Sequence, residues 1–149
     1  MRARVAILER WIAETIASYP AATAPFLAAE SDPFRNPVGH TVRQSLATLL
    51  DELQGEMDLE RIAPALDALV RLRAVQDLSA SQAVGFVFLL KHVLRELAPE
   101  EDLIALTDRI DRLALMAFDK YMQCREQLAE VRMNEWRRGC VSRAARGAK

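Results

Sequence analysis

Hydrophobic residues recur at spacings of three and four along most of the chain, as they do on one face of an α-helix. Alternating β-branched residues, which are typical of strands, are absent, and the helix-favouring residues Leu, Ala, Arg and Glu dominate. The pattern predicts an all-α bundle of about five main helices and one short helical piece. Their expected ranges are 4–18, 25–30 (the short piece), 39–54, 58–73, 79–97 and 99–138.

The polar residues between these segments fit helix ends. Two prolines with Asp and Asn predict a structured turn over residues 31–37. Gly55 is expected to stop one helix and Asp58 to cap the next. Ser79 and Gln82 have the spacing of a capping box.

The apolar face of each helix predicts which side chains enter the core. A core of this size lets a chain of 149 residues fold as one domain without disulfides or metals. The residues expected to point inward in the first four segments are Val5, Leu8, Ile12, Ile16, Phe26, Leu27, Val42, Leu46, Leu49, Leu50, Leu53, Ile62, Leu66, Leu69 and Val70.

The last helix is unusually long. Pro99 fits its first turn, and the three acidic residues that follow complement the positive end of the helix dipole. No Pro or Gly then occurs before Gly139, which predicts about 39 helical residues spanning roughly 60 Å. The expected radius of gyration of the domain is only about 15 Å. The helix must therefore project beyond the globular body.

This helix carries two apolar stripes whose combined arc is too wide for an ordinary surface helix. The first consists of Leu103, Leu106, Ile110, Leu113, Ala117, Tyr121, Cys124, Leu128 and Val131. The second consists of Ile104, Leu115, Phe118, Met122, Ala129, Met133 and Trp136. For the first half of the helix, one open interpretation is that both stripes enter the same core. Beyond about Gln123 the body should have ended, so Leu128, Val131, Met133 and Trp136 need a partner, which a homodimer would supply.

Charge and cysteine content narrow the class of protein. The net charge of −1 indicates no attraction to nucleic acid. Two cysteines, without a CxxC pair or a secretory leader, favour a cytoplasmic protein without disulfides. Residues 1–138 are expected to form the domain and 139–149 a flexible, basic tail. This tail is the only segment suited to an acidic partner or an anionic membrane surface.

No motif for catalysis, metal or cofactor binding is present. His40 and His92 are the only histidines, and neither has a nucleophile or orienting acid in a local motif. His92 lies on the polar side of its helix, so haem or metal ligation by it is not expected. We therefore expect a non-enzymatic protein without a cofactor. Cys124 is expected to pack in the core, and Cys140 to be exposed.

Phe88 lies on the same polar arc as His92. An aromatic residue on a polar face is a candidate contact for another protein. The alternative interpretation is that a neighbouring helix covers it. The candidate dimer or partner contacts are Phe88, Phe118, Met122, Leu128, Val131, Met133 and Trp136.

Three segments resemble a known family. Residues 32–41 (DPFRNPVGHT) resemble a signature of the RsbRD-type N-terminal domain. Residues 71–77 (RLRAVQD) leading into 79–88 (SASQAVGFVF), and residues 121–126 (YMQCRE), are similar to the same family. The resemblance covers about Ile12 to Arg138. This family is the sensory domain of the RsbT co-antagonist proteins, which regulate a bacterial stress sigma factor.

The resemblance implies a globin-like helical bundle without haem that forms dimers and acts as a sensor input. In the co-antagonist proteins the domain leads through a long helix into a STAS domain that carries phosphorylated threonines. We find no STAS segment in this sequence, so no phosphoacceptor is carried over. Two readings of the signature residues are open: they bind a signal, or they organise turns, with Arg71 or Arg73 pairing with Asp32 or Asp77. These residues are Asp32, Arg35, Asn36, Arg71, Arg73, Gln76 and Asp77.

Two functions follow from the sequence. The first is a stand-alone sensory or regulatory homodimer that responds to a signal and acts on an unidentified regulatory protein in bacterial stress or signalling regulation. The second is a non-catalytic accessory or assembly subunit of a cytoplasmic or membrane-associated complex, which would use Trp136, Phe88 and the basic tail as contacts.

Overall fold

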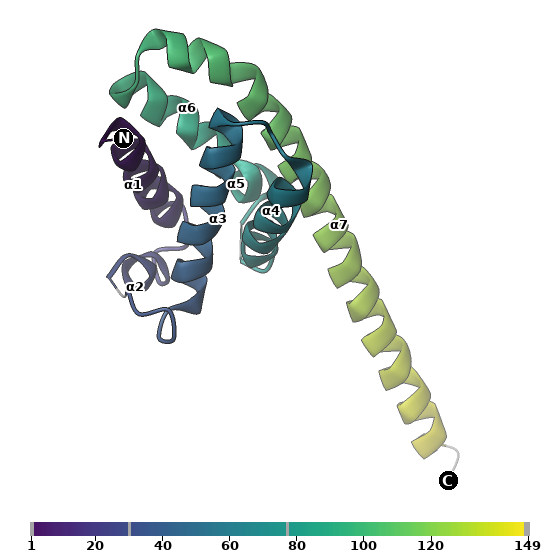
Figure 1. Cartoon of the computed structure of the whole chain (residues 1–149). Helices are drawn as coiled ribbons and strands as arrows, with labels where there is room; N and C mark the ends of the chain where they lie inside the picture. Colours follow the sequence, from purple (N-terminus) through teal and green to yellow (C-terminus); the bar gives the residue numbers. More distant parts are fainter. Residues whose placement is uncertain (1, 30, 77, 148–149) are drawn as a thin grey trace.

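The computed structural model describes residues 2–29, 31–76 and 78–147. These residues form seven helices and no strand, which confirms the all-α prediction. Figure 1 shows α1 to α6 packed together on one side of the first half of α7, while the second half of α7 runs away from them. The helices are α1 (Arg2–Ala17), α2 (Ala24–Ala29), α3 (Pro37–Gln54), α4 (Leu59–Ala74), α5 (Ala80–Val84), α6 (Phe86–Leu97) and α7 (Glu100–Gly147).

Short polar side chains start the helices where the sequence predicts. The Asp58 carboxylate accepts a hydrogen bond from the backbone N–H of Glu60 at the beginning of α4. Ser79 and Gln82 form the predicted capping box at the beginning of α5. Each cap satisfies backbone donors that have no partner inside the helix.

The core is built mainly from α3, α4, α6 and the first half of α7. All the residues of α3 and α4 that were expected to point inward are buried. In α1 the prediction is partly wrong, because Val5 is 51% exposed while Ile7 and Trp11 are buried. Phe26 is also exposed, and Leu27 alone anchors α2. Helical spacing does not determine the rotation of α1, which packs against both α3 and α6.

The predicted helix over 79–97 is two helices, α5 and α6, joined at Gly85. A Cβ atom at position 85 would lie 2.8 Å from the carbonyl oxygen of Ser81. Glycine therefore permits the tight junction. The junction lets α5 pack against α4 and α7 while α6 crosses to α1.

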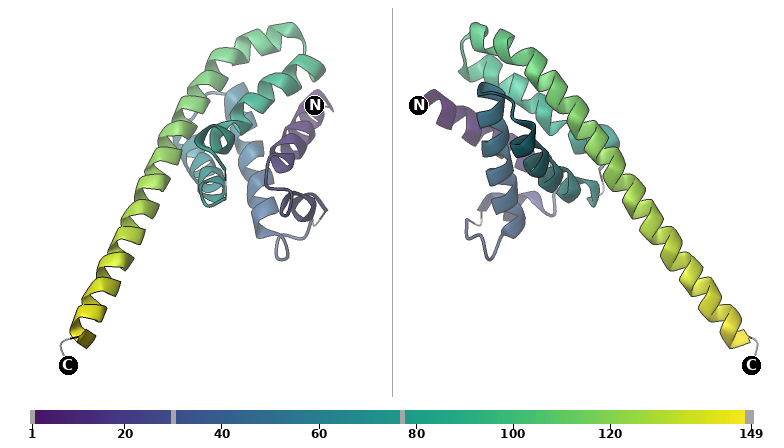
Figure 2. Two further views of the ribbon diagram at one scale, coloured as in Figure 1. Left: turned by 180° about the vertical axis from the view of Figure 1, so that it is seen from behind. Right: turned by 45° about the vertical axis from the view of Figure 1, so that its right-hand side comes forward.

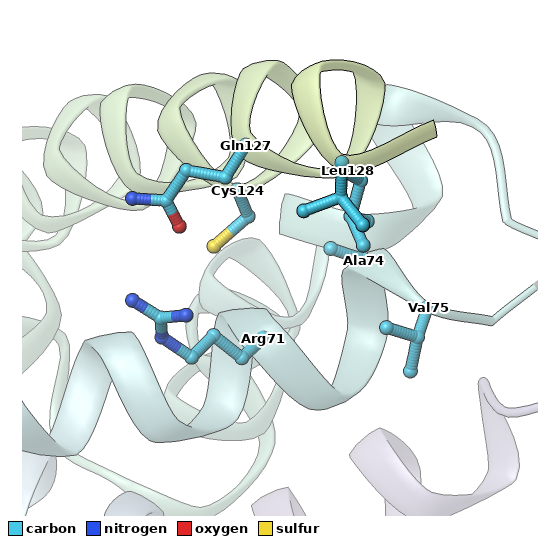
Figure 3. A pocket seen from close by; sticks show the side chains of 7 residues that line it. Arg71, Ala74, Val75, Cys124, Gln127 and Leu128 are labelled. Carbon is cyan, nitrogen blue, oxygen red and sulfur yellow. The ribbon is translucent and has the colours of Figure 1, made fainter. Parts of the chain in front are cut away.

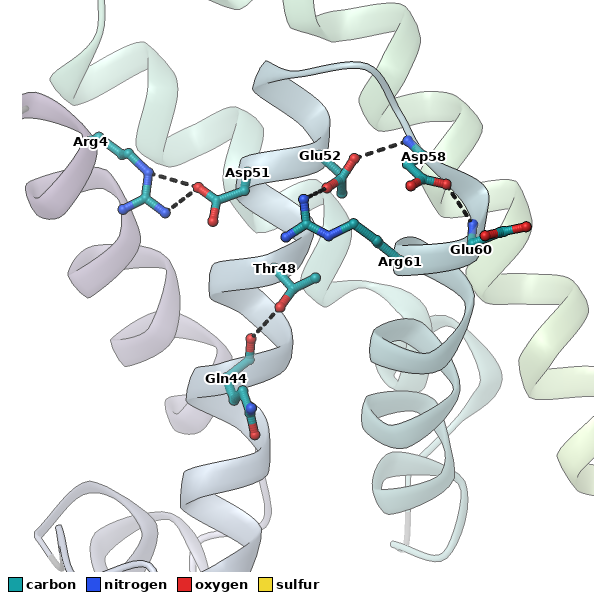
Figure 4. Close-up of polar contacts among 8 residues, drawn as sticks. All are labelled: Arg4, Gln44, Thr48, Asp51, Glu52, Asp58, Glu60 and Arg61. Carbon is teal, nitrogen blue, oxygen red and sulfur yellow. Dashed lines mark hydrogen bonds and ion pairs between the residues drawn. The ribbon is translucent and has the colours of Figure 1, made fainter.

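A polar network holds the turn between α3 and α4 (Figure 4). The buried carboxylate of Glu52 accepts a hydrogen bond from the backbone N–H of Asp58 at 2.9 Å and pairs with the Arg61 guanidinium at 2.5 Å. Met57, which precedes Asp58 in this turn, adopts a left-handed backbone conformation with a φ of 58°. From α7, Arg109 donates to the carbonyl oxygens of Leu53 and Gly55. The turn is thereby tied to the long helix.

The last helix is longer than predicted. α7 has 48 residues and continues through Gly139 to Gly147, which gives a length of about 70 Å at 1.5 Å per residue. One exposed glycine in a helix costs only about 1 kcal/mol, so Gly139 alone does not end it. Within the described part of the chain, no residue after Cys124 is buried. The remaining residues of α7 project from the body, as both views in Figure 2 show.

We expect Trp11→Phe to lower the free energy of unfolding by about 2–3 kcal/mol. Trp11 is fully buried, and its indole N–H donates to the carbonyl oxygen of Phe86 at 2.7 Å. The substitution removes this hydrogen bond between α1 and α6 and leaves a cavity. Phe34→Leu is the control, because the Phe34 side chain is 96% exposed and its replacement should cost less than about 0.5 kcal/mol. Urea unfolding followed by circular dichroism measures both, and equal losses would contradict the assignment.

Candidate interaction surface and buried arginine cluster

The first apolar stripe of α7 faces the body. Its members from Leu106 to Cys124 are buried, and Leu103 is partly buried. They pack against α4, α5 and α6. This stripe is therefore the part of α7 that belongs to the core.

The second stripe is exposed along its whole length. Its members Ile104, Leu115, Phe118, Met122, Met133 and Trp136 are between 41% and 70% exposed, and Ala129 is exposed as well. At 100° per residue the two stripes are centred about 130° apart, so one body cannot cover both. The interpretation that both stripes enter one core is therefore wrong. We call this exposed set the outer stripe of α7.

Phe88 lies beside the outer stripe. It is 44% exposed on α6, so the neighbouring helices leave much of it uncovered. The Lys91 ammonium lies 5.5 Å from the centroid of the Phe88 ring and 2.5 Å from a carboxylate oxygen of Asp111 on α7. Asp111 falls on the same arc of α7 as Leu115. The Lys91–Asp111 ion pair therefore lies between Phe88 and the outer stripe.

Leu128 and Val131 lie on a different face of α7 from the outer stripe. They line a groove of about 270 Å³ between α7 and the end of α4 (Figure 3). Cys124 points from α7 toward α4 in this groove, and burial raises the pKa of its thiol. A thiol with a raised pKa is a poor nucleophile at neutral pH, so Cys124 serves packing. Cys140 is exposed.

The signature turn before α3 is organised by Asp32 and Asn36. The Asp32 side chain accepts a hydrogen bond from the backbone N–H of Phe34, and its carbonyl oxygen accepts from the N–H groups of Arg35 and Asn36. Asn36 is 1% exposed; its amide donates to the Leu27 carbonyl and its side-chain oxygen caps α3. These contacts fix the path from α2 into α3.

The arginines of the second signature segment lie elsewhere and face different ways. Arg71 is exposed and pairs with Asp67 one turn earlier on α4. Arg73 is fully buried, and Gln76 is partly buried in the turn after α4. The pairing of Arg71 or Arg73 with Asp32 is therefore not observed. Asp77 lies outside the described residues.

Arg73 is the centre of a buried polar cluster. Its guanidinium donates to the carbonyl oxygens of Gln82 and Ala83 at 2.6 and 2.7 Å, which ties α4 to α5. It also lies 4.9 Å from the ring centroid of Tyr19 and 5.4 Å from that of Phe86. Burial lowers the pKa of Arg73 and raises the pKa of Tyr19.

The sequence pattern missed Trp11, Thr15 and Tyr19 as buried residues. Trp11, Thr15 and Tyr19 recur every four residues, which is a signal for one helix face. Thr15 and Tyr19 were overlooked because Thr and Tyr are ambiguous in burial. Packing resolves the ambiguity, since both are buried.

Comparison with protein-family models matches residues 5–136 to the family described as RsbT co-antagonist protein rsbRD N-terminal domain. The chain belongs to this family. Comparisons with curated proteins and with solved structures return no match. Among the described residues of this rsbRD-type domain, no helix is long and apolar enough to cross a membrane, and no cluster of three or more His, Cys, Asp or Glu side chains is arranged to hold a metal ion.

We expect Asn36→Ala to lower the free energy of unfolding by about 2 kcal/mol, because it removes a helix cap and a buried link to α2. Arg71→Ala is the control from the other signature segment. Arg71 forms a surface ion pair within α4, so its loss should cost at most about 0.5 kcal/mol. Denaturant titration of both variants distinguishes them; a larger loss for Arg71→Ala would contradict this structural role for Asn36.

Proposed function

We propose that this rsbRD-type domain is a non-enzymatic sensory module that forms a homodimer and regulates an output protein through direct contacts. Membership of the family supports a sensory and regulatory role in stress signalling. The observation that carries the dimer is the outer stripe, whose apolar members between Ile104 and Trp136 are all exposed. A cytoplasmic location and the globin-like arrangement implied by the resemblance are part of the same proposal.

A second copy of the chain is the partner that fits the outer stripe best. Exposed apolar surfaces of this extent mark contact sites, and a helix face pairs with its own copy about a two-fold axis. Leu115, Met122, Ala129 and Trp136 are seven residues apart, as in one of the two apolar series of a coiled-coil seam. The second series, three residues further on, starts with Phe118 and continues with Arg125 and Arg132. This spacing supports two α7 helices packed side by side.

The two helices are proposed to run parallel. In that arrangement each member of the seven-residue series meets its own copy. The bodies then lie at one end of the pair and the free ends of α7 at the other. A signal bound in the body could shift α7. Because α7 is one continuous helix, the shift would be transmitted to its free end.

We expect Met122→Glu to raise the dissociation constant of the dimer by about a hundredfold, because it places two carboxylates against each other in an apolar seam. Gln123→Glu is the matched control. It introduces the same charge at the next exposed residue, on a face between the two stripes. Sedimentation equilibrium measures both constants.

The result is decisive in either direction. A wild-type chain that is monomeric at micromolar concentration would remove the dimer. Equal weakening by the two charges would show that the outer stripe is not the seam. In either case the exposed surface would instead favour an accessory subunit that contacts a different protein.

Cys140 provides a test of the parallel arrangement. It is exposed and continues the line of Met133 and Trp136 on α7. In a parallel pair the two Cys140 side chains lie within disulfide range, so mild oxidation should give a covalent dimer on non-reducing gels. Cys140→Ser should abolish this dimer, whereas Cys124→Ser should leave it, because Cys124 is buried. A dimer in solution that does not crosslink would contradict the parallel arrangement.

The free end of α7 supports the second candidate function. Arg137, Arg138, Arg143 and Arg146 follow Trp136 with no acidic residue among them. An acidic segment of an output protein fits this charge, and the same contact would serve an accessory subunit.

A further inference from the structure

The groove of about 270 Å³ lies where α7 leaves the body (Figure 3). One of its walls is the end of α4, which belongs to the family-like segment 71–77. The other wall begins with Cys124, which belongs to the family-like segment 121–126. Two segments that carry the family resemblance, although far apart in the sequence, therefore meet at one cavity.

The walls of the groove are mostly apolar and open to solvent. Val75 at the end of α4 is 65% exposed and Val131 on α7 is 54% exposed, while Ala74 and Leu128 beside them form the floor. The groove follows α7 from Cys124 to Val131, which is about 10 Å at 1.5 Å per residue. Concave sites with apolar walls and a few polar groups are typical of small-molecule binding.

Arg71 and Gln127 form the polar end of the groove. In Figure 3 the Arg71 guanidinium points from α4 toward the Gln127 amide and the Cys124 thiol on α7. The ion pair of Arg71 with Asp67 uses the Nε atom, at 2.8 Å, so it does not occupy the two terminal nitrogens. The planar guanidinium is suited to hold a carboxylate through two parallel hydrogen bonds.

The charge around this polar end is positive. Burial raises the pKa of the Cys124 thiol, the nearby charges of Arg71 and Lys120 lower it, and Asp67 raises it. Two cations and one carboxylate thus surround the thiol, which leaves one positive charge. A ligand with a single negative charge matches this balance.

The shape of the groove favours a flat ring over a single alkyl chain. A volume of 270 Å³ over a length of about 10 Å gives a mean width of about 5 Å, whereas an alkyl chain is about 4 Å across. A guanidinium also packs well against an aromatic face. An aromatic ring therefore uses both the apolar walls and the polar end.

We propose that this groove binds a small aromatic carboxylic acid, with the carboxylate at Arg71 and the ring between Val75 and Val131. The binding site is argued from the groove alone. Its role as the signal site of the module rests on the proposed function.

This proposal gives the signature residues different roles. Asp32 and Asn36 organise a turn, and Arg73 ties α4 to α5. Arg71 contributes only a surface ion pair to the fold, and its side chain borders a cavity. Of the two interpretations left open by the sequence, turn organisation fits the first three residues and ligand binding fits Arg71.

The groove is placed to act on α7. A ligand between Val75 and Val131 joins the end of α4 to the part of α7 that follows its last buried residue, Cys124. Val131 is nine residues after Met122, so the two side chains point about 180° apart. The groove therefore stays open in the proposed dimer, and a bound ligand would fix the angle at which α7 leaves the body.

The test is an NMR titration of the full chain with sodium 2-naphthoate at neutral pH, followed on the backbone amide signals. We expect saturable shifts at Val75, Gln127 and Val131, with a dissociation constant of roughly 0.1–1 mM for a ligand of this size. The probe 2-naphthamide has the same rings without the charge, and acetate has the charge without the rings. Each should bind at least about tenfold more weakly than naphthoate. Octanoate, which has a chain in place of the rings, should also bind more weakly.

Variants at exposed positions locate the site without disturbing the core. Arg71→Gln keeps hydrogen-bond donors and removes the charge, so it should weaken naphthoate about tenfold and leave naphthamide unchanged. Val131→Glu places a carboxylate in the wall and should weaken naphthoate by about the same factor. Val141→Glu is the matched control, because it makes the same substitution at a 70% exposed valine of α7 outside the groove, and it should bind like the wild type.

Three results would overturn the proposal. They are the lack of saturable naphthoate binding, binding of naphthamide or octanoate as tight as that of naphthoate, and equal naphthoate affinities of Val131→Glu and Val141→Glu. The Met122→Glu variant separates this test from that of the dimer. Because Met122 lies on the opposite side of α7, this variant should bind naphthoate like the wild type even when it is monomeric. Loss of the dimer with binding kept would remove only the dimer, and loss of binding with the dimer kept would remove only this site.

Discussion

The geometry of α7 is the constraint on which the rest of the structure depends. A helix with two apolar stripes about 130° apart cannot bury both against one small body. The body covers the stripe from Leu106 to Cys124 and leaves the outer stripe in solvent. Every other helix is arranged around the covered stripe, directly or through a neighbour. Because the body cannot cover the outer stripe, this stripe is available to the second chain of the proposed dimer. The two stripes of α7 thus underlie both the packing of the body and the proposed assembly.

The buried guanidinium of Arg73 joins several helices in the interior of the body. An isolated charge in a core is costly, yet here it is held by two carbonyl oxygens and two aromatic rings that come from segments far apart in the sequence. It joins the end of α1 to α4, α5 and α6 in one small region. Because α5 also rests on α7, a change at Arg73 has a direct mechanical route to the projecting helix. The buried cluster around Arg73 is thus connected through α5 to α7, the helix that carries the outer stripe.

Much of this arrangement is predictable from local patterns. The apolar faces of α3 and α4, the caps at Asp58 and Ser79, and the projection of α7 all follow from helical spacing and capping chemistry, which act over a few residues. The errors occur where the outcome depends on distant contacts. The inward face predicted for α1 was rotated from the observed one because α1 packs against both α3 and α6. The junction at Gly85 was missed because α5 packs on α4 and α6 on α1, although both also contact α7.

The sequence by itself determined that the chain is helical, where most helices begin, that α7 outruns the body, and that it carries two stripes. These features depend on the order of residues within one helix. Only the tertiary structure decided which stripe is covered, that Asn36 joins α2 to α3, and that Arg73 enters the core while Arg71 remains at the surface. Two arginines separated by one residue point about 160° apart on a helix, and which one turns inward depends on what packs against it. Here the rings of Tyr19 and Phe86 and the carbonyl oxygens of α5 meet Arg73, and this contact exists only in the folded chain.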